Sequence, residues 1–245
     1  MPPSTVSGVG SNRKIKERYS RILAVLGEEG LNRIRKSSVL VAGAGGLGSA
    51  VIAYLAGVGV GKLGIADGDV VEVHNLDRQV IHAGNLGMNK AESAKLFVEK
   101  LNPDVEVVTF GNLGREDMDV VREFDVVVSC VDSFASRFAL NELCVKAEKP
   151  MVHGAIAGFE GELMVFLPGG PCYRCVYPGN YEERSFPVVP PVAGIVGSMQ
   201  AVETIKLICG DGVTTDLLRM DFRYMEFLRV KVAKRDGCPV CSGLR

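Results

Sequence analysis

The stretch VLVAGAGGLGSAVIAYLAGVGVGKLGIAD, residues 39–67, decides the fold that we expect for this chain of 245 residues. A β-branched run leads into Gly43, Gly45 and Gly48, spaced as G-x-G-x-x-G, and then into an apolar helical segment and a second short run. This order is typical of a nucleotide-binding parallel sheet, because the glycines let backbone N–H groups approach a phosphate at a helix N-terminus. Asp67 ends the second run, where a carboxylate accepts hydrogen bonds from ribose hydroxyls. The stretch predicts a nucleotide site, but it does not separate NAD from ATP.

The composition argues against a membrane or a nucleic acid as partner. Residues 37–61 carry no charge over 25 positions, which is long enough to cross a bilayer, but seven glycines interrupt the run where turns are expected. We therefore expect a buried strand, loop and helix there. The formal net charge is −1, so there is no basic surplus to bind nucleic acid. Because the N-terminus lacks a signal-peptide pattern, we expect a cytoplasmic protein, with residues 1–12 as a flexible tail.

Short β-branched runs alternate with helical periodicity up to about residue 157, which indicates βαβ units and a parallel sheet. The expected strands are 38–43, 62–67, 105–110, 125–131 and 150–155. The expected helices are 47–57, 89–101, 115–123 and 134–148.

The pattern changes after about residue 158. Two segments, 160–170 and 216–234, resemble antiparallel strands with hairpin connections, and between them lie a Pro-rich loop at 178–191 and a helix near 194–209. The predicted fold class is therefore α/β, with a Rossmann-like, mostly parallel sheet continued by antiparallel strands. We expect one domain over 13–245, with a nucleotide-binding half at about 36–157 and a smaller C-terminal lobe at about 158–245.

Charged residues after the second strand favour ATP over NAD. Asn75, Arg78 and Lys90 follow Asp67 closely, and Asp132 ends a later strand. The carboxyl ends of such strands meet at the ligand crevice. Cations there would stabilise charge on a transferred phosphorus centre, and a carboxylate suits hydrated Mg²⁺. Each residue alone also has a structural reading, as an ion pair, a solvated helix residue or a helix N-cap. Their conjunction favours ATP.

Four of the seven cysteines form two C-x-x-C pairs, Cys172 with Cys175 and Cys238 with Cys241. Two such knuckles commonly build a tetrahedral, structural zinc site, although redox-active or unligated thiols are alternatives. The other three cysteines sit in apolar segments, and the three histidines form no ligand or triad spacing, so we expect packing or structural roles for Cys130, Cys144, Cys209, His74, His82 and His153.

With these residues in place, the chain resembles the ThiF/MoeB/HesA family of ubiquitin-activating-enzyme-like adenylyltransferases, the molybdopterin-synthase and ThiS activator type. The resemblance covers about residues 18–242. It rests on RYSR (18–21), GAGGLG (43–48), ADGD (66–69), NLDRQ (75–79), Lys90, CVD (130–132), PCYRC (171–175), GSMQAVE (197–203) and CPVC (238–241).

The resemblance implies roles for individual positions. Gly46 and Asp67 match nucleotide-contacting positions, and Asn75, Arg78 and Lys90 match phosphate-binding ones. Asp132 matches the aspartate that supports Mg²⁺. Arg21 matches an arginine that, in family homodimers, reaches the ATP site of the partner subunit. The four paired cysteines match the ligands of a structural zinc ion.

The implied reaction activates a small ubiquitin-fold protein at its C-terminal Gly-Gly. The terminal carboxylate attacks the α-phosphorus of ATP and yields an acyl-adenylate and pyrophosphate. Many relatives carry a cysteine in the loop that crosses to the partner, but residues 176–194 contain none, so the resemblance supports adenylation and not a thioester or persulfide step. It leaves open the partner and the pathway, which include molybdopterin, thiamin, tRNA thiolation and protein conjugation.

Three other functions compete with this one. An NAD-dependent oxidoreductase would use the same first unit, but it needs neither the cations nor the zinc knuckles. A non-catalytic, zinc-stabilised module could bind ubiquitin-fold proteins without turnover. Relatives that adenylate a tRNA base or a peptide terminus form a third class, which the near-neutral charge disfavours.

Overall fold

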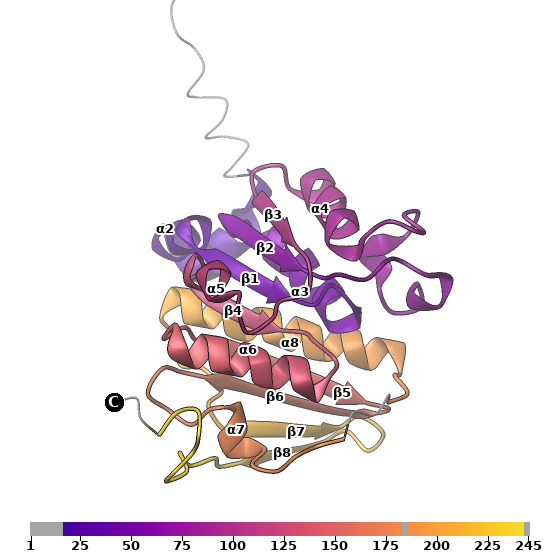
Figure 1. Cartoon of the computed structure of the whole chain (residues 1–245). Coiled ribbons are helices and arrows are strands. Elements are labelled where there is room, and N and C mark those ends of the chain that lie inside the picture. The colour runs from indigo at the N-terminus through magenta and orange to yellow at the C-terminus, as the bar shows by residue number, and fades with distance from the viewer. Residues whose placement is uncertain (1–16, 183–185, 243–245) are drawn as a thin grey trace, which may run out of the picture.

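An eight-stranded sheet organises the chain in the order β3-β2-β1-β4-β5-β6-β7-β8 (Figure 1). The structure is a computed structural model that describes residues 17–182 and 186–242, so the expected tail at 1–12 lies outside the described residues. The strands are β1 (Ser38–Ala42), β2 (Lys62–Ala66), β3 (Glu106–Phe110), β4 (Val126–Ser129), β5 (Met151–Ala157), β6 (Glu160–Phe166), β7 (Leu217–Asp221) and β8 (Glu226–Val230).

The first five strands are parallel and the last three are added antiparallel, which confirms the predicted fold class. From β1 the chain steps outward to β2 and β3, and then returns to pair β4 with the other side of β1. At such a reversal, connections leave the two central strands in opposite directions and open a crevice at their carboxyl ends. The sheet therefore places a binding crevice beyond Ala42 and Ser129.

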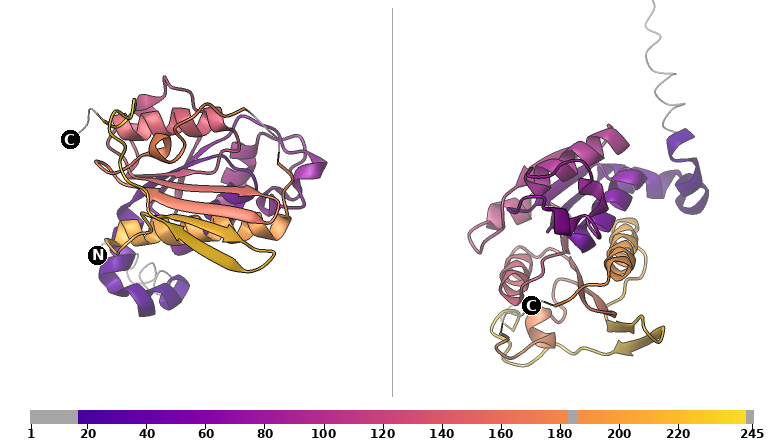
Figure 2. Two further views of the ribbon diagram at one scale, coloured as in Figure 1. Left: turned by 90° about the horizontal axis from the view of Figure 1, so that it is seen from below. Right: turned by 90° about the vertical axis from the view of Figure 1, so that its right-hand side faces the viewer.

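Helices cover both faces of the sheet (Figure 2). Alternate residues of β1 point to opposite sides: Val39 and Val41 pack in the core with α3, α4 and α8, whereas Leu40 packs with α6. The helices are α2 (Ser20–Lys36), α3 (Gly46–Val58), α4 (Lys90–Leu101), α5 (Met118–Arg122), α6 (Phe134–Lys146), α7 (Tyr173–Val176) and α8 (Pro190–Cys209), with short 3₁₀ turns η1 (Val73–Asn75) and η2 (Val80–His82).

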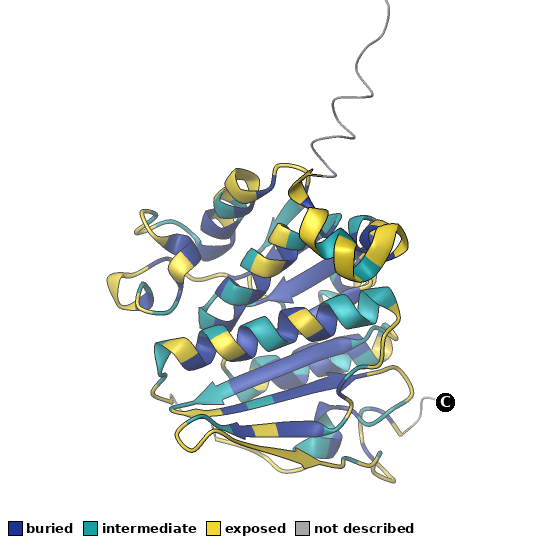
Figure 3. Cartoon of the chain, turned by 180° about the vertical axis from the view of Figure 1, so that it is seen from behind, coloured by how far each residue is buried: buried dark blue, intermediate teal, exposed yellow. Residues whose placement is uncertain are grey.

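The charge-free run at 37–61 divides into β1, a loop and α3, as expected. α3 ends at Gly59, whose φ of 82° is left-handed and therefore suits glycine. The central strands β1, β2 and β4 are almost entirely buried, whereas β8 at the edge of the sheet is exposed and the helices carry both buried and exposed residues (Figure 3).

Several helices differ from the sequence-based expectation. α8 begins at Pro190 rather than near residue 194, because proline tolerates the first helical turn, where its missing N–H needs no partner. α5 is shorter than the expected 115–123. α2 was not expected, and its start is held by a long-range contact in which the Asn102 amide donates to the Tyr19 hydroxyl at 2.8 Å.

α8 is the one described helix with the length and apolar composition to cross a membrane. It packs against α3 and against β5 and β6, and 44% of its apolar window is buried within the chain. Its buried side chains Val192 and Val196 belong to the same core as Val39 and Val41 of β1.

Candidate functional site

A cleft of about 620 Å³ lies at the carboxyl ends of the parallel strands. Its walls come mainly from the segments between β1 and α3, between β2 and α4, after β3 and after β4, with Ile156 in β5 and Phe186 and Val188 before α8. Of the residues expected at the site, the cleft brings together Gly43, Gly45, Gly46, Asp67, Arg78, Lys90 and Asp132.

The glycine loop fits only because two of its positions lack a side chain. Gly43 has a φ of 97°, and a Cβ there would lie 2.7 Å from the carbonyl oxygen of Cys130 at the end of β4. A Cβ on Gly48 would lie 2.0 Å from the carbonyl oxygen of Gly43. Gly48 does not line the cleft; it lets α3 approach the strand closely enough to aim its N-terminus at the cleft.

The Ala44 peptide within this loop is held at both ends. Its N–H donates to Asp67 Oδ2 at 2.8 Å, and its carbonyl oxygen lies 2.8 Å from Nε2 of His82. A carbonyl only accepts, so Nε2 carries the proton, and Nδ1 faces Ser93 Oγ at 2.9 Å. Burial lowers the pKa of His82, which keeps the ring neutral. His82 has the structural role expected for it, and Asp67 braces the loop while also facing the cleft.

Two of the three cations that line the cleft, Arg78 and Lys90, have a carboxylate partner. The Lys90 ammonium, at the start of α4, lies 2.9 Å from Asp69 Oδ2, and the side chain of Lys90 is buried. Arg78 donates from Nη1 to Asp77 at 2.7 Å and to the carbonyl of His74 at 3.0 Å. Lys90 therefore has one carboxylate partner and can still donate to a ligand in the cleft. Arg78 likewise has further N–H groups that could donate to an anion.

The cleft is also lined by residues that the sequence reasoning missed. Arg137 is buried in the first turn of α6 and donates from Nε to the carbonyl of Val131 at 3.2 Å. Asn112 accepts the N–H of Gly68 at 2.8 Å. Asn112 follows β3 by two residues, so the rule that crevice residues follow strand ends would have found it. Arg137 had no such signal, because it lies within a helix.

Two expected site residues lie elsewhere. Asn75 does not line the cleft, and its side-chain oxygen accepts the N–H of Glu72 at 3.0 Å within the 3₁₀ turn. Arg21 is exposed on α2, outside the cleft of its own chain. Phosphate binding by Asn75 and a role for Arg21 across a dimer both stay predictions.

Residues 186–188, which precede α8, lie at one edge of the cleft. Phe186 and Val188 form part of its wall, and the N–H of Gly158 donates to the carbonyl of Pro187 at 2.7 Å. This short segment thus forms the cleft's edge near the end of β5. No cysteine occurs in this part of the chain.

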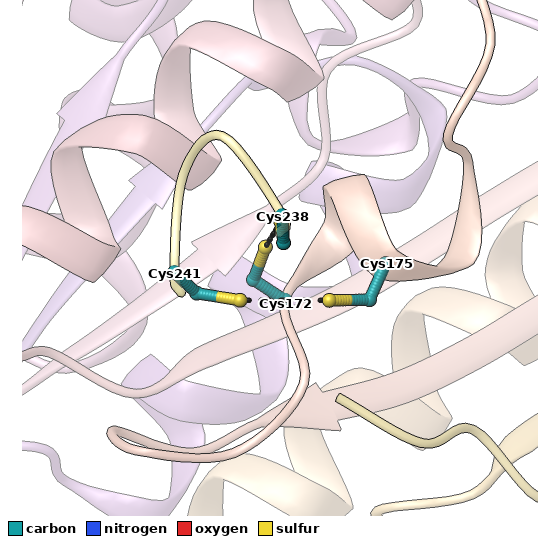
Figure 4. Close-up of side chains that lie close together, drawn as sticks. All are labelled: Cys172, Cys175, Cys238 and Cys241. Carbon is teal, nitrogen blue, oxygen red and sulfur yellow. Dashed lines mark hydrogen bonds between the residues drawn. The ribbon is translucent and has the colours of Figure 1, made fainter. Parts of the chain in front are cut away.

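The four paired cysteines converge at a second location (Figure 4). Cys172 Sγ lies 3.8 Å from Cys238 Sγ, and Cys175 Sγ lies 3.5 Å from Cys241 Sγ; all four sulfurs lie within 4.8 Å of one another and are buried. Sulfurs about 2.3 Å from one tetrahedral zinc ion would be about 3.8 Å apart. The cluster could therefore hold zinc, and four thiolates would leave no position for a catalytic water.

A buried polar chain lies beside the cysteine cluster. Nε2 of His153 in β5 lies 2.9 Å from Glu162 Oε1 in β6, and the Tyr177 hydroxyl donates to the other carboxylate oxygen. Burial alone would raise the pKa of Glu162, but the contacts with His153 and Tyr177 outweigh it and hold that pKa below its usual value. These hydrogen bonds link β5, the last parallel strand, to β6, the first antiparallel one.

Comparison with known sequences places most of the chain in one family. The profile of the ThiF family matches residues 19–240. The SAMP-activating enzyme E1 of Haloferax volcanii is 44% identical over 239 residues, which cover 92% of this chain and 88% of that protein. The adenylyltransferase and sulfurtransferase MOCS3 of Aedes aegypti is 40% identical over 240 residues, but the chain spans only 55% of its length.

A solved structure supports the fold independently. Crystalline MccB of E. coli superimposes with a TM-score of 0.82 over 92% of this chain and 72% of that one, at 22% identity. At this identity the match concerns the fold alone.

Proposed function

The chain belongs to the ThiF family and is an enzyme of the nucleotidyltransferase class, and from this premise we propose that it activates the C-terminal carboxylate of a small ubiquitin-fold protein with ATP. One observation carries the proposal. A glycine loop of the dinucleotide type shares its cleft with Arg78 and Lys90, which hydride transfer would not need. The SAMP-activating and MOCS3 relatives agree with this reading.

In the proposed reaction, an oxygen of the acceptor's terminal Gly-Gly carboxylate attacks the α-phosphorus of ATP. The bond from that phosphorus to the bridging oxygen breaks, and pyrophosphate leaves with the electron pair. A C-terminal carboxylate is ionised at neutral pH, so no general base is required. Arg78 and Lys90 would stabilise the charge that develops on the leaving pyrophosphate.

The remaining cleft residues would position the nucleotide. Asp67 has acceptor capacity for ribose hydroxyls beyond its bond to Ala44. Asp132 is exposed at the end of β4, and among the described residues its side chain makes no hydrogen bond, which suits a ligand of hydrated Mg²⁺. Gly43, Gly45 and Gly46 leave room for the phosphates at the N-terminus of α3.

Three further expectations belong to this proposal. The four cysteines would hold a structural zinc ion. A homodimer would bring Arg21 of one copy to the cleft of the other, which the exposure of Arg21 on α2 permits. Residues 13–245 would act as one adenylation domain, since a single sheet runs from the nucleotide-binding half into the C-terminal lobe.

ATP–pyrophosphate exchange with Mg²⁺ tests the proposal, measured with and without a Gly-Gly-ended ubiquitin-fold protein from the same organism. We expect exchange only with that protein, and its loss when the last glycine is removed. If no such acceptor supports exchange although ATP binds, the result would favour a binding module or another acceptor. Tight binding of NAD without ATP would favour the oxidoreductase.

A further inference from the structure

A buried amide on α6, next to the four-cysteine cluster, has N–H groups that the fold does not use. Asn141 is 1% exposed, and its Nδ2 has no hydrogen-bond partner of ordinary geometry among the described residues. Its Oδ1, by contrast, accepts the N–H of Tyr173, the first residue of α7, at 2.8 Å. Because a backbone N–H requires an acceptor, this bond fixes which end of the amide is the oxygen and leaves Nδ2 as the donor. Buried polar groups almost always have partners, so this donor requires an explanation.

The position of Asn141 places the donor beside Cys172. Tyr173 directly follows Cys172, the N-cap of α7, so the amide that holds the Tyr173 N–H lies at the start of the first knuckle. Asn141, Cys172 and Cys241 line one cavity of about 410 Å³, and Val145, one turn further along α6, packs against the cysteines. Burial raises the pKa of Cys172, and the Asn141 side chain opposes this effect by favouring the thiolate.

The other sulfurs show what Cys172 lacks. The N–H of Arg235 donates to Cys175 Sγ at 3.5 Å, and two N–H groups of its own knuckle favour the thiolate of Cys238. Within the described chain, no backbone N–H donates to Cys172 Sγ. Four thiolates carry more negative charge than one zinc ion neutralises, and hydrogen bonds to metal ligands orient them and tune the metal. Cys172 is therefore a sulfur of the cluster that needs a side-chain donor.

We propose that Asn141 is a positioning residue of the zinc site, which donates from Nδ2 to the thiolate of Cys172 while its Oδ1 holds the N–H of Tyr173. The inference rests on the zinc ion of the proposed function, but on neither the nucleotide nor the acceptor protein. One side chain then fixes both the orientation of a ligating sulfur and the start of the helix that follows it. The amide also joins the cluster to α6, whose first turn carries Arg137 in the cleft, so the metal site and the cleft share one helix.

Asn102 is a buried amide whose donors are already used, and it provides the matched control. It is fully buried at the end of α4, and its Nδ2 donates to the Tyr19 hydroxyl at 2.8 Å and to the carbonyl of Ala56 at 2.7 Å. These partners precede α2 and lie in α3, outside the cluster. Asn102→Leu should therefore lower the melting temperature, while zinc affinity stays within about twofold of wild type.

Zinc competition against a chromophoric chelator at neutral pH tests the inference with Asn141→Asp and Asn141→Leu. Aspartate keeps the acceptor for Tyr173 and loses the donor, whereas leucine keeps the bulk and loses both. We expect zinc affinity to fall about tenfold to a hundredfold in both variants, as for other residues that hydrogen-bond a metal ligand. A residue that only held the Tyr173 N–H would lose affinity in Asn141→Leu and keep it in Asn141→Asp.

Cobalt substitution gives a readout that a structural role would not move. A hydrogen bond lowers the energy of a thiolate lone pair, so its loss should shift the sulfur-to-cobalt charge-transfer band of both Asn141 variants to longer wavelength. Asn102→Leu should keep the wild-type band. A wild-type band in either Asn141 variant would overturn the donor role, even where zinc affinity had fallen.

The outcomes distinguish this inference from the proposed function. Wild-type zinc affinity in Asn141→Asp would overturn the donor role, while zinc in the wild-type protein would still support the metal site. An equal loss of zinc affinity in Asn102→Leu would also overturn it, because the effect would then follow stability alone. A wild-type protein that binds no zinc would overturn the inference together with the zinc site, and ATP–pyrophosphate exchange would still test adenylation.

Discussion

The cleft and the four-cysteine cluster differ in whether their polar side chains already have partners within the fold. In the cleft, charged groups face open space with few partners, as Asp132 does. In the cluster, all four sulfurs point inward and are buried against one another (Figure 4). The groups in the cleft are therefore available to bind a ligand, whereas the sulfurs of the cluster contact one another and stabilise the fold.

This difference has a physical consequence for mutation. Groups that are unsatisfied in the folded chain contribute little to its stability, so their loss should affect binding or turnover. Groups that hold a metal hold the chain as well, because their ligand site exists only in the folded state. The two regions should therefore separate cleanly when activity and stability are measured on the same variants.

The largest effect should come from Cys238→Ser. The residue joins the C-terminal knuckle to that of α7, and N–H groups of Cys241 and Val240 outweigh burial to lower its pKa to about 7. We expect loss of bound zinc and at least about 3 kcal/mol of stability, or roughly 6–12 °C in melting temperature. Metal analysis and thermal unfolding measure both.

Cys209→Ser is the matched control, since this thiol lies at the end of α8 outside the cluster. It should keep the metal and melt near wild type. If Cys238→Ser also kept its metal content and melting temperature, the cluster would not be the stabilising region that the comparison requires.

Arg78→Ala should show the reverse pattern. Removing one cation from the cleft should lower ATP–pyrophosphate exchange by at least about 10²-fold, as for other preorganised charge-stabilising groups. The melting temperature should move by less than about 2 °C, because the pair with Asp77 is partly exposed. Arg122→Ala removes a similar exposed pair, with Asp119 at 3.2 Å, far from the cleft, and should change neither quantity. An unchanged exchange rate in Arg78→Ala would remove this residue from the mechanism.

Short-range spacing made most of the cleft predictable. The glycine pattern and the end of β2 lie within one stretch of sequence, so the loop, α3 and Asp67 follow from local geometry. Both cysteine knuckles were also visible locally. Their meeting was not, because 62 residues, which include α8, β7 and β8, separate Cys175 from Cys238.

Side-chain direction was the part that spacing could not supply. Asn75 and Gln79 carry the same amide and lie four residues apart, yet one turns back to its own 3₁₀ turn and the other faces the cleft. The difference arises from the dihedral angles of two short turns, which no periodicity describes. Arg137 was missed for a related reason, since its burial depends on packing between α6 and the end of β4.

The pH dependence of the free energy of unfolding tests the stabilising role of the buried polar groups beside the cysteine cluster. Burial lowers the pKa of His153, so the folded chain keeps this ring neutral while the unfolded chain protonates it near pH 6.5. The unfolded state then binds more protons, and stability falls as the pH drops from 7.5 to 5.5 by about 1 kcal/mol for this group. Glu162, with its lowered pKa, adds a further loss only at more acidic pH.

Urea unfolding at both pH values measures this term. His153→Gln should lower stability at pH 7.5 but lose about 1 kcal/mol less than wild type on acidification. His74→Gln changes an exposed ring and should keep the wild-type dependence. Parallel curves for wild type and His153→Gln would show that the ring titrates alike in both states.

The smallest effect should come from Cys130→Ala, which changes a cysteine that lines the cleft and not the cluster. This thiol borders the cleft, but it is 7% exposed and lies 3.6 Å from Gln200 Oε1 behind the glycine loop. Burial raises the pKa of Cys130 well above its usual value, so almost no thiolate is present at neutral pH to act as a nucleophile. We expect exchange within about twofold of wild type and a loss of about 1 kcal/mol from the smaller side chain. Complete loss of exchange with an unchanged melting temperature would instead show that the Cys130 thiol takes part in the reaction, although its raised pKa disfavours the thiolate.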